Sequence, residues 1–213
     1  MAEAYRSLFK TKLRSLIEGA ILLFLALAYG FWASSYSIRV AGTFVGDIVL
    51  DNTPVFHLNV IIIEGALIGL FGVFVLLLAK PQYLPFTLKA VAILIAVRAF
   101  MISATHLGIY PNQITPDVGF FDSIYKALDL QAGYFFSAHT AVPLLLSLIF
   151  WDERFWRYVF LVAAVVFGTS VLLAHVHYSI DVFAAPFMTY SIFKLAQYLF
   201  KEDYKLIEPI TKI

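Results

Sequence analysis

Cysteine is absent from the 213-residue chain. Disulfide bonds, thiolate nucleophiles and cysteine-ligated metals are therefore excluded. Charge is also scarce, because only 14% of the residues are Asp, Glu, Lys or Arg, against roughly 25% in an average soluble domain. The net charge is +1 and no stretch is densely basic, so the composition gives no reason to expect a nucleic-acid partner.

Long apolar segments make up most of the chain. Hydrophobic residues account for 62% of it, and the mean hydropathy is +0.86. A helix needs about 20 apolar residues to cross a bilayer. Six segments qualify, and the first is too long for the core of a signal peptide, so we interpret it as a retained span. The sequence predicts an all-α, polytopic protein, a single membrane domain over residues 1–213 with six transmembrane helices. The predicted helices cover residues 16–36, 55–79, 84–107, 134–151, 156–174 and 177–200.

The basic residues predict how these helices are oriented, because Lys and Arg in short loops mark the cytoplasmic side. Twelve of the 15 basic residues fall on the side of the two termini. Only Arg39 and Lys126 fall in the opposite loops, and Arg98 lies within a segment. Both termini are therefore predicted to be cytoplasmic. The twelve residues are Arg6, Lys10, Lys12, Arg14, Lys80, Lys89, Arg154, Arg157, Lys194, Lys201, Lys205 and Lys212.

Two short amphipathic helices are expected outside the spans. The first 15 residues separate an apolar face from basic side chains, which predicts a short N-terminal helix on the inner leaflet. A simple topology signal is the alternative. Residues 121–128 have apolar side chains at helical spacing, which predicts an interfacial helix covering the outer end. A plain surface connection is the alternative there.

Three ionisable residues converge near the predicted outer face, where each is a functional candidate because charge inside a membrane is costly. His139 lies five residues into the fourth segment, and Asp181 lies four residues into the sixth. At a rise of about 1.5 Å per residue, these positions are about 7 Å and about 6 Å deep. His177 opens the sixth segment. The sequence thus predicts one shallow site on the extracytoplasmic or luminal side.

The spacing of these residues favours phosphoryl transfer. His177 and Asp181 have i,i+4 spacing, so on a helix they share a face and the carboxylate can accept a ring N–H. That contact fixes the tautomer and makes the other ring nitrogen more nucleophilic. His139, across the cleft, can protonate a leaving oxygen and later deprotonate an acceptor. A phosphate ester fits this arrangement, because histidine attacks phosphorus and the phosphohistidine passes the group on.

Two alternatives remain for the histidines. His139, His175, His177 and Asp181 are residue types that bind zinc. His175 and His177 would diverge on a helix, however, and we predict neither a metal nor a cofactor. The other alternative is that these are structural histidines at helix ends.

Arg98 and Glu64 form a second candidate pair. Each lies nine residues from the outer end of its predicted span, so both are about 13 Å deep. A mutual ion pair would offset the cost of burying two charges. In a second interpretation, Arg98 binds the substrate phosphate and Glu64 holds Arg98. The two are compatible, because an arginine has five N–H donors.

Two strings resemble the sphingomyelin synthase family, within the wider superfamily of type 2 phosphatidic acid phosphatases. FFSAHT at residues 135–140 resembles the family's Ser-Gly-His-Thr motif, and AHVHYSID at residues 174–181 resembles its His-x-His-Tyr-Thr-x-Asp motif. The region of Asp47, Asp51 and Pro54, followed by Glu64-Gly65, is similar more weakly.

The resemblance implies a six-span fold and lipid phosphotransfer at the outer or luminal face. Carried over by position, His177 is the nucleophile, Asp181 its partner and His139 the acid/base. Ser137, His175 and Tyr178 lie in the matched strings and are predicted to contact the substrate, together with Arg98 and Glu64.

The chain departs from both branches of the superfamily. Val171 stands where the phosphatases have an arginine, and their Lys-x6-Arg-Pro motif is missing, which favours the synthase-like branch. Ala138 replaces the synthase glycine, and Gly133 stands where an acidic residue is expected.

The leading hypothesis is a lipid phosphotransferase that moves a phospho-headgroup from a phospholipid to a lipid alcohol such as ceramide or diacylglycerol. With water as the acceptor, the same site would be a lipid phosphatase or a phospholipase-C-like hydrolase. A non-catalytic membrane transporter or scaffold is the third hypothesis.

Overall fold

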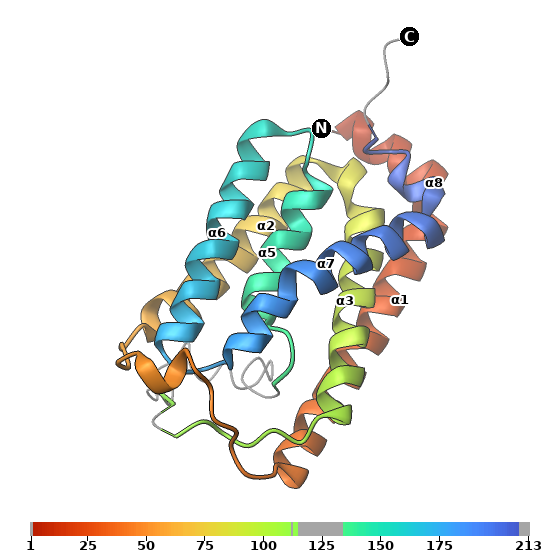
Figure 1. The fold of residues 1–213 in the computed structure, drawn as a ribbon. Coiled ribbons are helices and arrows are strands. Elements are labelled where there is room, and N and C mark those ends of the chain that lie inside the picture. The colour runs from red at the N-terminus through yellow and green to blue at the C-terminus, as the bar shows by residue number, and fades with distance from the viewer. Residues whose placement is uncertain (1, 112, 115–133, 209–213) are drawn as a thin grey trace.

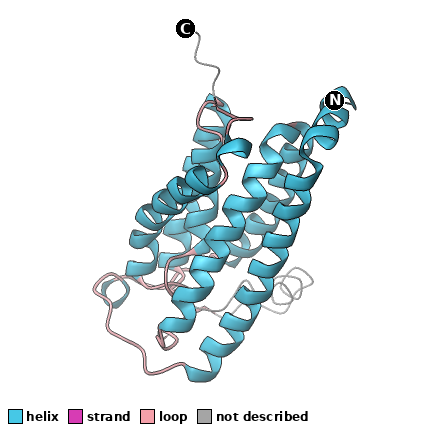
Figure 2. Cartoon of the chain, turned by 90° about the vertical axis from the view of Figure 1, so that its right-hand side faces the viewer, coloured by secondary structure: helices cyan, strands magenta, loops and turns pink. Residues whose placement is uncertain are grey.

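The computed structural model describes residues 2–111, 113–114 and 134–208, and every regular element within them is a helix (Figures 1 and 2). The expected all-α class is confirmed. The longer helices are α1 (Ala2–Val40), α2 (Gly65–Ala79), α3 (Leu84–Ala104), α5 (Ala138–Ile149), α6 (Arg154–Leu173) and α7 (Ser179–Leu199). The short helical segments are η1 (Leu50–Asn52), the π-helical η2 (Val60–Glu64), η3 (Pro81–Tyr83) and α8 (Lys201–Tyr204). The predicted interfacial helix at residues 121–128 lies outside the described residues.

Four helical segments of the described chain are long and apolar enough to cross a membrane. Apolar side chains also point outward from the bundle. Ile68 of α2 is 71% exposed and Phe187 of α7 is 76% exposed. Lipid accommodates such side chains, whereas an exposed apolar surface of this extent is rare on soluble monomers. These helices indicate a membrane-embedded protein. The four segments are Lys12–Val40, Val60–Ala79, Pro81–Ala104 and Arg154–Leu173.

The other two predicted spans are also helices, but they differ from these four. Helix α5 has 12 residues, which span only about 18 Å. Helix α7 has 21 residues and contains Asp181, Thr189 and Lys194 among its apolar side chains. The six helices therefore follow the predicted order, and four of them have the length and apolarity of a span.

The N-terminal residues do not form the separate short helix that the sequence suggested. They belong to α1, which continues without a break for 39 residues. The physical reason is that neither glycine nor proline occurs before Gly19, so nothing interrupts the helix between its basic start and its apolar stretch.

Helix α7 holds the bundle together. Helix α1 packs along α3, whereas α5 packs on both α6 and α7. Figure 1 shows α7 running obliquely across α5 and α3, and it contacts both. The core between them contains the fully buried rings of Phe86, Phe136 and Phe150.

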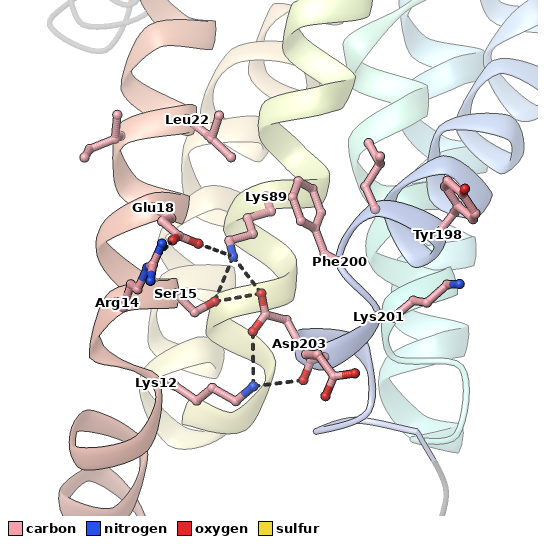
Figure 3. Close-up of a pocket in the computed structure, with 13 residues that line it drawn as sticks. Lys12, Arg14, Ser15, Glu18, Leu22, Lys89, Tyr198, Phe200, Lys201 and Asp203 are labelled. Carbon is pink, nitrogen blue, oxygen red and sulfur yellow. Dashed lines mark hydrogen bonds and ion pairs between the residues drawn. The ribbon is translucent and has the colours of Figure 1, made fainter.

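A buried charge cluster closes the end of the bundle at which α1 begins and α7 ends (Figure 3). The Lys89 ammonium of α3 lies 2.7 Å from a carboxylate oxygen of Asp203 in α8, and both side chains are buried. Lys89 also donates to Ser15 at 2.8 Å and to Glu18 at 3.3 Å, both on α1. Three helices are therefore joined through one ammonium group.

Removal of the Asp203 carboxylate should destabilise the protein. In the Asp203→Ala variant, Lys89 keeps only Glu18 as an acidic partner and is buried with incomplete compensation. We expect a loss of about 3 kcal/mol in the free energy of unfolding, measured by thermal unfolding in detergent. Glu202→Ala is the control, because the Glu202 side chain is 75% exposed and should contribute under about 1 kcal/mol. Equal losses in the two variants would contradict the assignment.

Candidate active site

The chain around His177 differs from the predicted helix. His175 has a φ of 54°, and Tyr178 is extended, so α7 begins only at Ser179. His177 and Asp181 therefore do not share a helix face. They still meet, because Asp181 is the third residue of α7 and its side chain turns back toward the residues before the helix.

Asp181 is the central acceptor of the site. Its side chain is fully buried, and Oδ2 lies 3.1 Å from His177 Nδ1. The same oxygen accepts the backbone N–H of Tyr178 at 3.2 Å. A carboxylate facing Nδ1 places the ring proton there, so the lone pair of His177 is on Nε2.

The second histidine lies beside the first. His139 is the second residue of α5, and its ring centroid is 6.2 Å from that of His177, with the rings edge to face. The backbone N–H of Ser137 donates to the Asp181 carbonyl at 3.0 Å, which joins the start of α5 to the start of α7. Two helix N-termini therefore meet here, and their dipoles favour an anion.

Arg98 reaches the same region from α3. Its Nε–H donates to the carbonyl of Phe136 at 3.3 Å, in the turn that leads into α5. The structure thus brings Arg98 to the turn before His139, as expected of a residue near the site.

The predicted Arg98–Glu64 ion pair is not formed. Glu64 ends the π-helical η2, which packs against α6, and its Oε2 is buried without a hydrogen-bond partner among the described residues. Arg98 lies on α3 and contacts the turn before α5. The two residues were placed at equal depth, but their helices are not neighbours.

Two more predicted substrate contacts are engaged by the protein itself. The Tyr178 hydroxyl donates to the Gly108 carbonyl at 2.8 Å and accepts the Val45 N–H at 3.2 Å. His175 is buried, with Nε2 3.5 Å from the Thr53 hydroxyl and its ring edge to face with Tyr110. Both side chains therefore hold outer loops against α7.

No group of three or more His, Asp or Glu side chains among the described residues is arranged to hold a metal ion. In place of such a group, the region has buried oxygen atoms without a hydrogen-bond partner in the described chain: Ser137 Oγ, Thr140 Oγ1 and Asp181 Oδ1. Most buried polar groups in proteins have partners, and exceptions require an explanation. A polar ligand next to Ser137 and Asp181 would provide one.

Backbone strain is concentrated beside the two histidines. Phe135, Phe136 and His175 have positive φ values of 120°, 29° and 54°. Non-glycine residues rarely adopt this conformation, and it costs of order 1–3 kcal/mol at each position. Such strain is commonly found in functional loops, where the surrounding structure maintains it.

Asp47 is an important residue to which the sequence analysis gave no role. Its Oδ2 accepts the backbone N–H of Ser179, the first residue of α7, at 2.7 Å. Its Oδ1 accepts the N–H groups of Val49 and Leu50 at 2.9 and 3.2 Å. Burial raises the pKa of Asp47, but these N–H donors outweigh burial and the pKa is lowered. Only the D-x-x-x-D pattern of the first outer loop, where Asp51 accepts the Asp47 N–H, hinted at this function.

Comparison of the chain with protein-family models, with curated proteins and with solved structures finds no match in any of the three.

The Asp47→Asn variant should weaken the anchoring of α7. The amide lacks the charge and keeps one acceptor oxygen, so we expect a loss of about 2 kcal/mol at neutral pH, measured by thermal unfolding in detergent. Because the folded-state pKa of Asp47 lies below the unfolded value, its stabilisation is complete above about pH 4 and is lost as the pH falls through the folded-state pKa. The gap between wild type and variant should therefore narrow in acid.

The matched control is Asp152→Asn, at an exposed carboxylate in the turn before α6. It should leave the unfolding temperature nearly unchanged. A gap for Asp47→Asn that widens as the pH falls would show that the assigned sign is wrong.

Proposed function

We propose that this protein is a membrane-embedded lipid phosphotransferase that acts through a phosphohistidine on His177. The observation that carries the proposal is the contact of His177 Nδ1 with the buried Asp181 carboxylate, beside a second histidine ring 6.2 Å away. One histidine is thereby prepared as a nucleophile, and the other lies within reach of the same phosphate.

In the first step, His177 Nε2 attacks the phosphorus of a phospholipid. The N–P bond forms as the bond from phosphorus to the lipid oxygen breaks, and His139 donates the proton that this oxygen needs to leave as an alcohol. Asp181 stabilises the positive charge that develops on the His177 ring.

In the second step, the headgroup moves to a lipid alcohol. His139, now neutral, accepts the proton of the incoming hydroxyl as its oxygen attacks phosphorus, and the N–P bond breaks. His177 returns to its initial state. The same residues therefore serve both half-reactions, as reversal of the first step requires.

The charge of the phosphate is met by two features of the site. The N-termini of α5 and α7 converge on it, and helix N-termini favour anions. Arg98 contacts the Phe136 carbonyl, and a guanidinium can bind a backbone carbonyl and a phosphate together.

The proposal includes a six-span topology with both termini cytoplasmic. The start of α1 and the end of α7 meet through Lys12, which donates to the Glu202 carbonyl at 3.0 Å, so the two ends lie on one side of the bundle. The distribution of Lys and Arg makes that side cytoplasmic, which puts His139 and His177 at the extracytoplasmic or luminal face. The resemblance of the two histidine strings to the sphingomyelin synthase family supports the same assignment.

The acceptor separates transfer from hydrolysis. Purified protein is incubated with a phospholipid labelled in its headgroup, with and without ceramide or diacylglycerol. We expect labelled lipid product only when the alcohol is present, and an acid-labile, base-stable label on the protein after quenching. Release of soluble headgroup at a rate unaffected by either alcohol would indicate a hydrolase instead.

His177→Ala should reduce turnover by roughly 1,000-fold or more and abolish the protein label, because the nucleophile is lost. His57→Ala is the matched control, because His57 is an exposed histidine of the first outer loop, and should retain activity. Labelling that persists in His177→Ala, with the unfolding temperature unchanged, would show that another residue is the nucleophile.

Arg98→Lys tests the phosphate-binding role. Lysine keeps the charge but lacks the planar fork that serves two acceptors at once. We expect kcat/KM to fall by about tenfold or more, with KM rising, while the protein stays folded. An unchanged KM with a lower unfolding temperature would limit Arg98 to supporting the Phe136 turn.

A further inference from the structure

A second polar region lies at the far end of α7 from the histidines. It is a groove of about 990 Å³ lined by α1, by Lys89 of α3, and by the junction of α7 and α8 (Figure 3). The buried ion pair of Lys89 and Asp203 forms its polar floor. Nothing in the proposed reaction uses this region.

The floor of the groove is a closed network without catalytic character. Ser15 and Lys89 are in contact, as in a serine–lysine pair, but the Ser15 hydroxyl donates to Asp203 Oδ2 at 2.7 Å. All three donors of Lys89 have acceptors. Lys89 is therefore a donor to Ser15 and does not act as its base.

The acidic groups of the groove are all paired. Glu18 accepts from Arg14 and Lys89, and Asp203 lies between Lys89 and Lys12. Glu202 is paired with Lys205 outside the groove, at 2.6 Å. The carboxylates are thus neutralised by cations of the protein itself.

Cationic capacity remains at the rim. Arg14 gives Glu18 only its Nε–H, and its side chain is 94% exposed. Lys201 is exposed and lies 4.8 Å over the Tyr198 ring, with no acidic partner among the described residues. Both residues can still bind an anion, and neither contributes to the buried floor.

The groove also has an apolar wall at the height where the helices change character. Leu22 of α1 and Leu199 of α7 are exposed beside it, 39% and 53% respectively. The apolar stretch of α1 follows Arg14, and that of α7 ends before Lys201. Cations and apolar side chains therefore lie next to each other at the expected level of the lipid headgroups.

We propose that this groove binds the phosphate of an anionic phospholipid from the leaflet on the side of the chain termini, with an acyl chain along the apolar wall. Arg14 and Lys201 bind the phosphate, and Leu22 and Leu199 contact the chain. A soluble anion would need only the rim, so the adjoining wall favours a lipid. Basic pockets between membrane helices bind anionic headgroups in this manner.

The test measures lipid binding and is independent of turnover. Delipidated protein in neutral detergent is titrated with phosphatidylglycerol, or with phosphatidylcholine of the same chains, and binding is followed by native mass spectrometry. Wild type should prefer phosphatidylglycerol. The double variant Arg14→Gln/Lys201→Gln should lose about fivefold in affinity for each charge removed, hence roughly twentyfold, and bind phosphatidylcholine as before.

The matched control is Lys194→Gln/Lys205→Gln, which makes the same change in charge near the same end but outside the groove. It should keep the preference for phosphatidylglycerol. If both double variants lose affinity equally, the effect is diffuse surface charge and the site is refuted. Unchanged affinity in Arg14→Gln/Lys201→Gln refutes it as well.

A second variant tests the apolar wall without changing charge. Leu22→Trp fills part of the groove and should weaken phosphatidylglycerol binding severalfold, with the unfolding temperature showing that the bundle is intact. Tight binding in Leu22→Trp would show that the lipid chain does not follow this wall.

Discussion

The buried carboxylate of Asp181 is the constraint on which the candidate site depends. A carboxylate without solvent is tolerated only when donors surround it, and here the donors are His177 and the Tyr178 N–H. Both precede α7, so the chain before the helix must fold back over the helix start. The backbone of the same residue accepts from Ser137, which fixes the beginning of α5. A single residue thereby sets the nucleophile, its tautomer and the helix that carries the second histidine.

The outer loops maintain this geometry against its own strain. The positive φ of His175 lets the chain reverse between α6 and α7, and Asp47 then holds the first turn of α7 through Ser179. Gly108 shows how closely these loops approach, because a Cβ there would lie 2.5 Å from the Gly42 carbonyl oxygen. Loop-to-helix hydrogen bonds, rather than helix packing alone, therefore position the reactive side chains.

Sequence patterns could predict the helices and the site's members, but not its construction. Long apolar stretches fix where helices form, and the spacing of His177 and Asp181 predicted a contact that exists, although the helix begins two residues later than expected. The Arg98–Glu64 pair failed because depth along a helix says nothing about which helices are neighbours. The function of Asp47 was invisible for a related reason: its partner Ser179 is 132 residues away in sequence, and no local pattern connects them.

The two ends of the bundle treat buried polar groups in opposite ways. At the end of the termini, Lys89, Asp203 and Ser15 satisfy one another, so the cluster stabilises the fold and has no donor left for chemistry. At the other end, Ser137 Oγ and Asp181 Oδ1 are buried without a partner among the described residues, next to strained backbone. Unsatisfied polar atoms lower stability, and they are tolerated where a ligand supplies the missing partner. Because helix α7 spans both ends, the satisfied cluster stabilises the same helix that the histidine site strains.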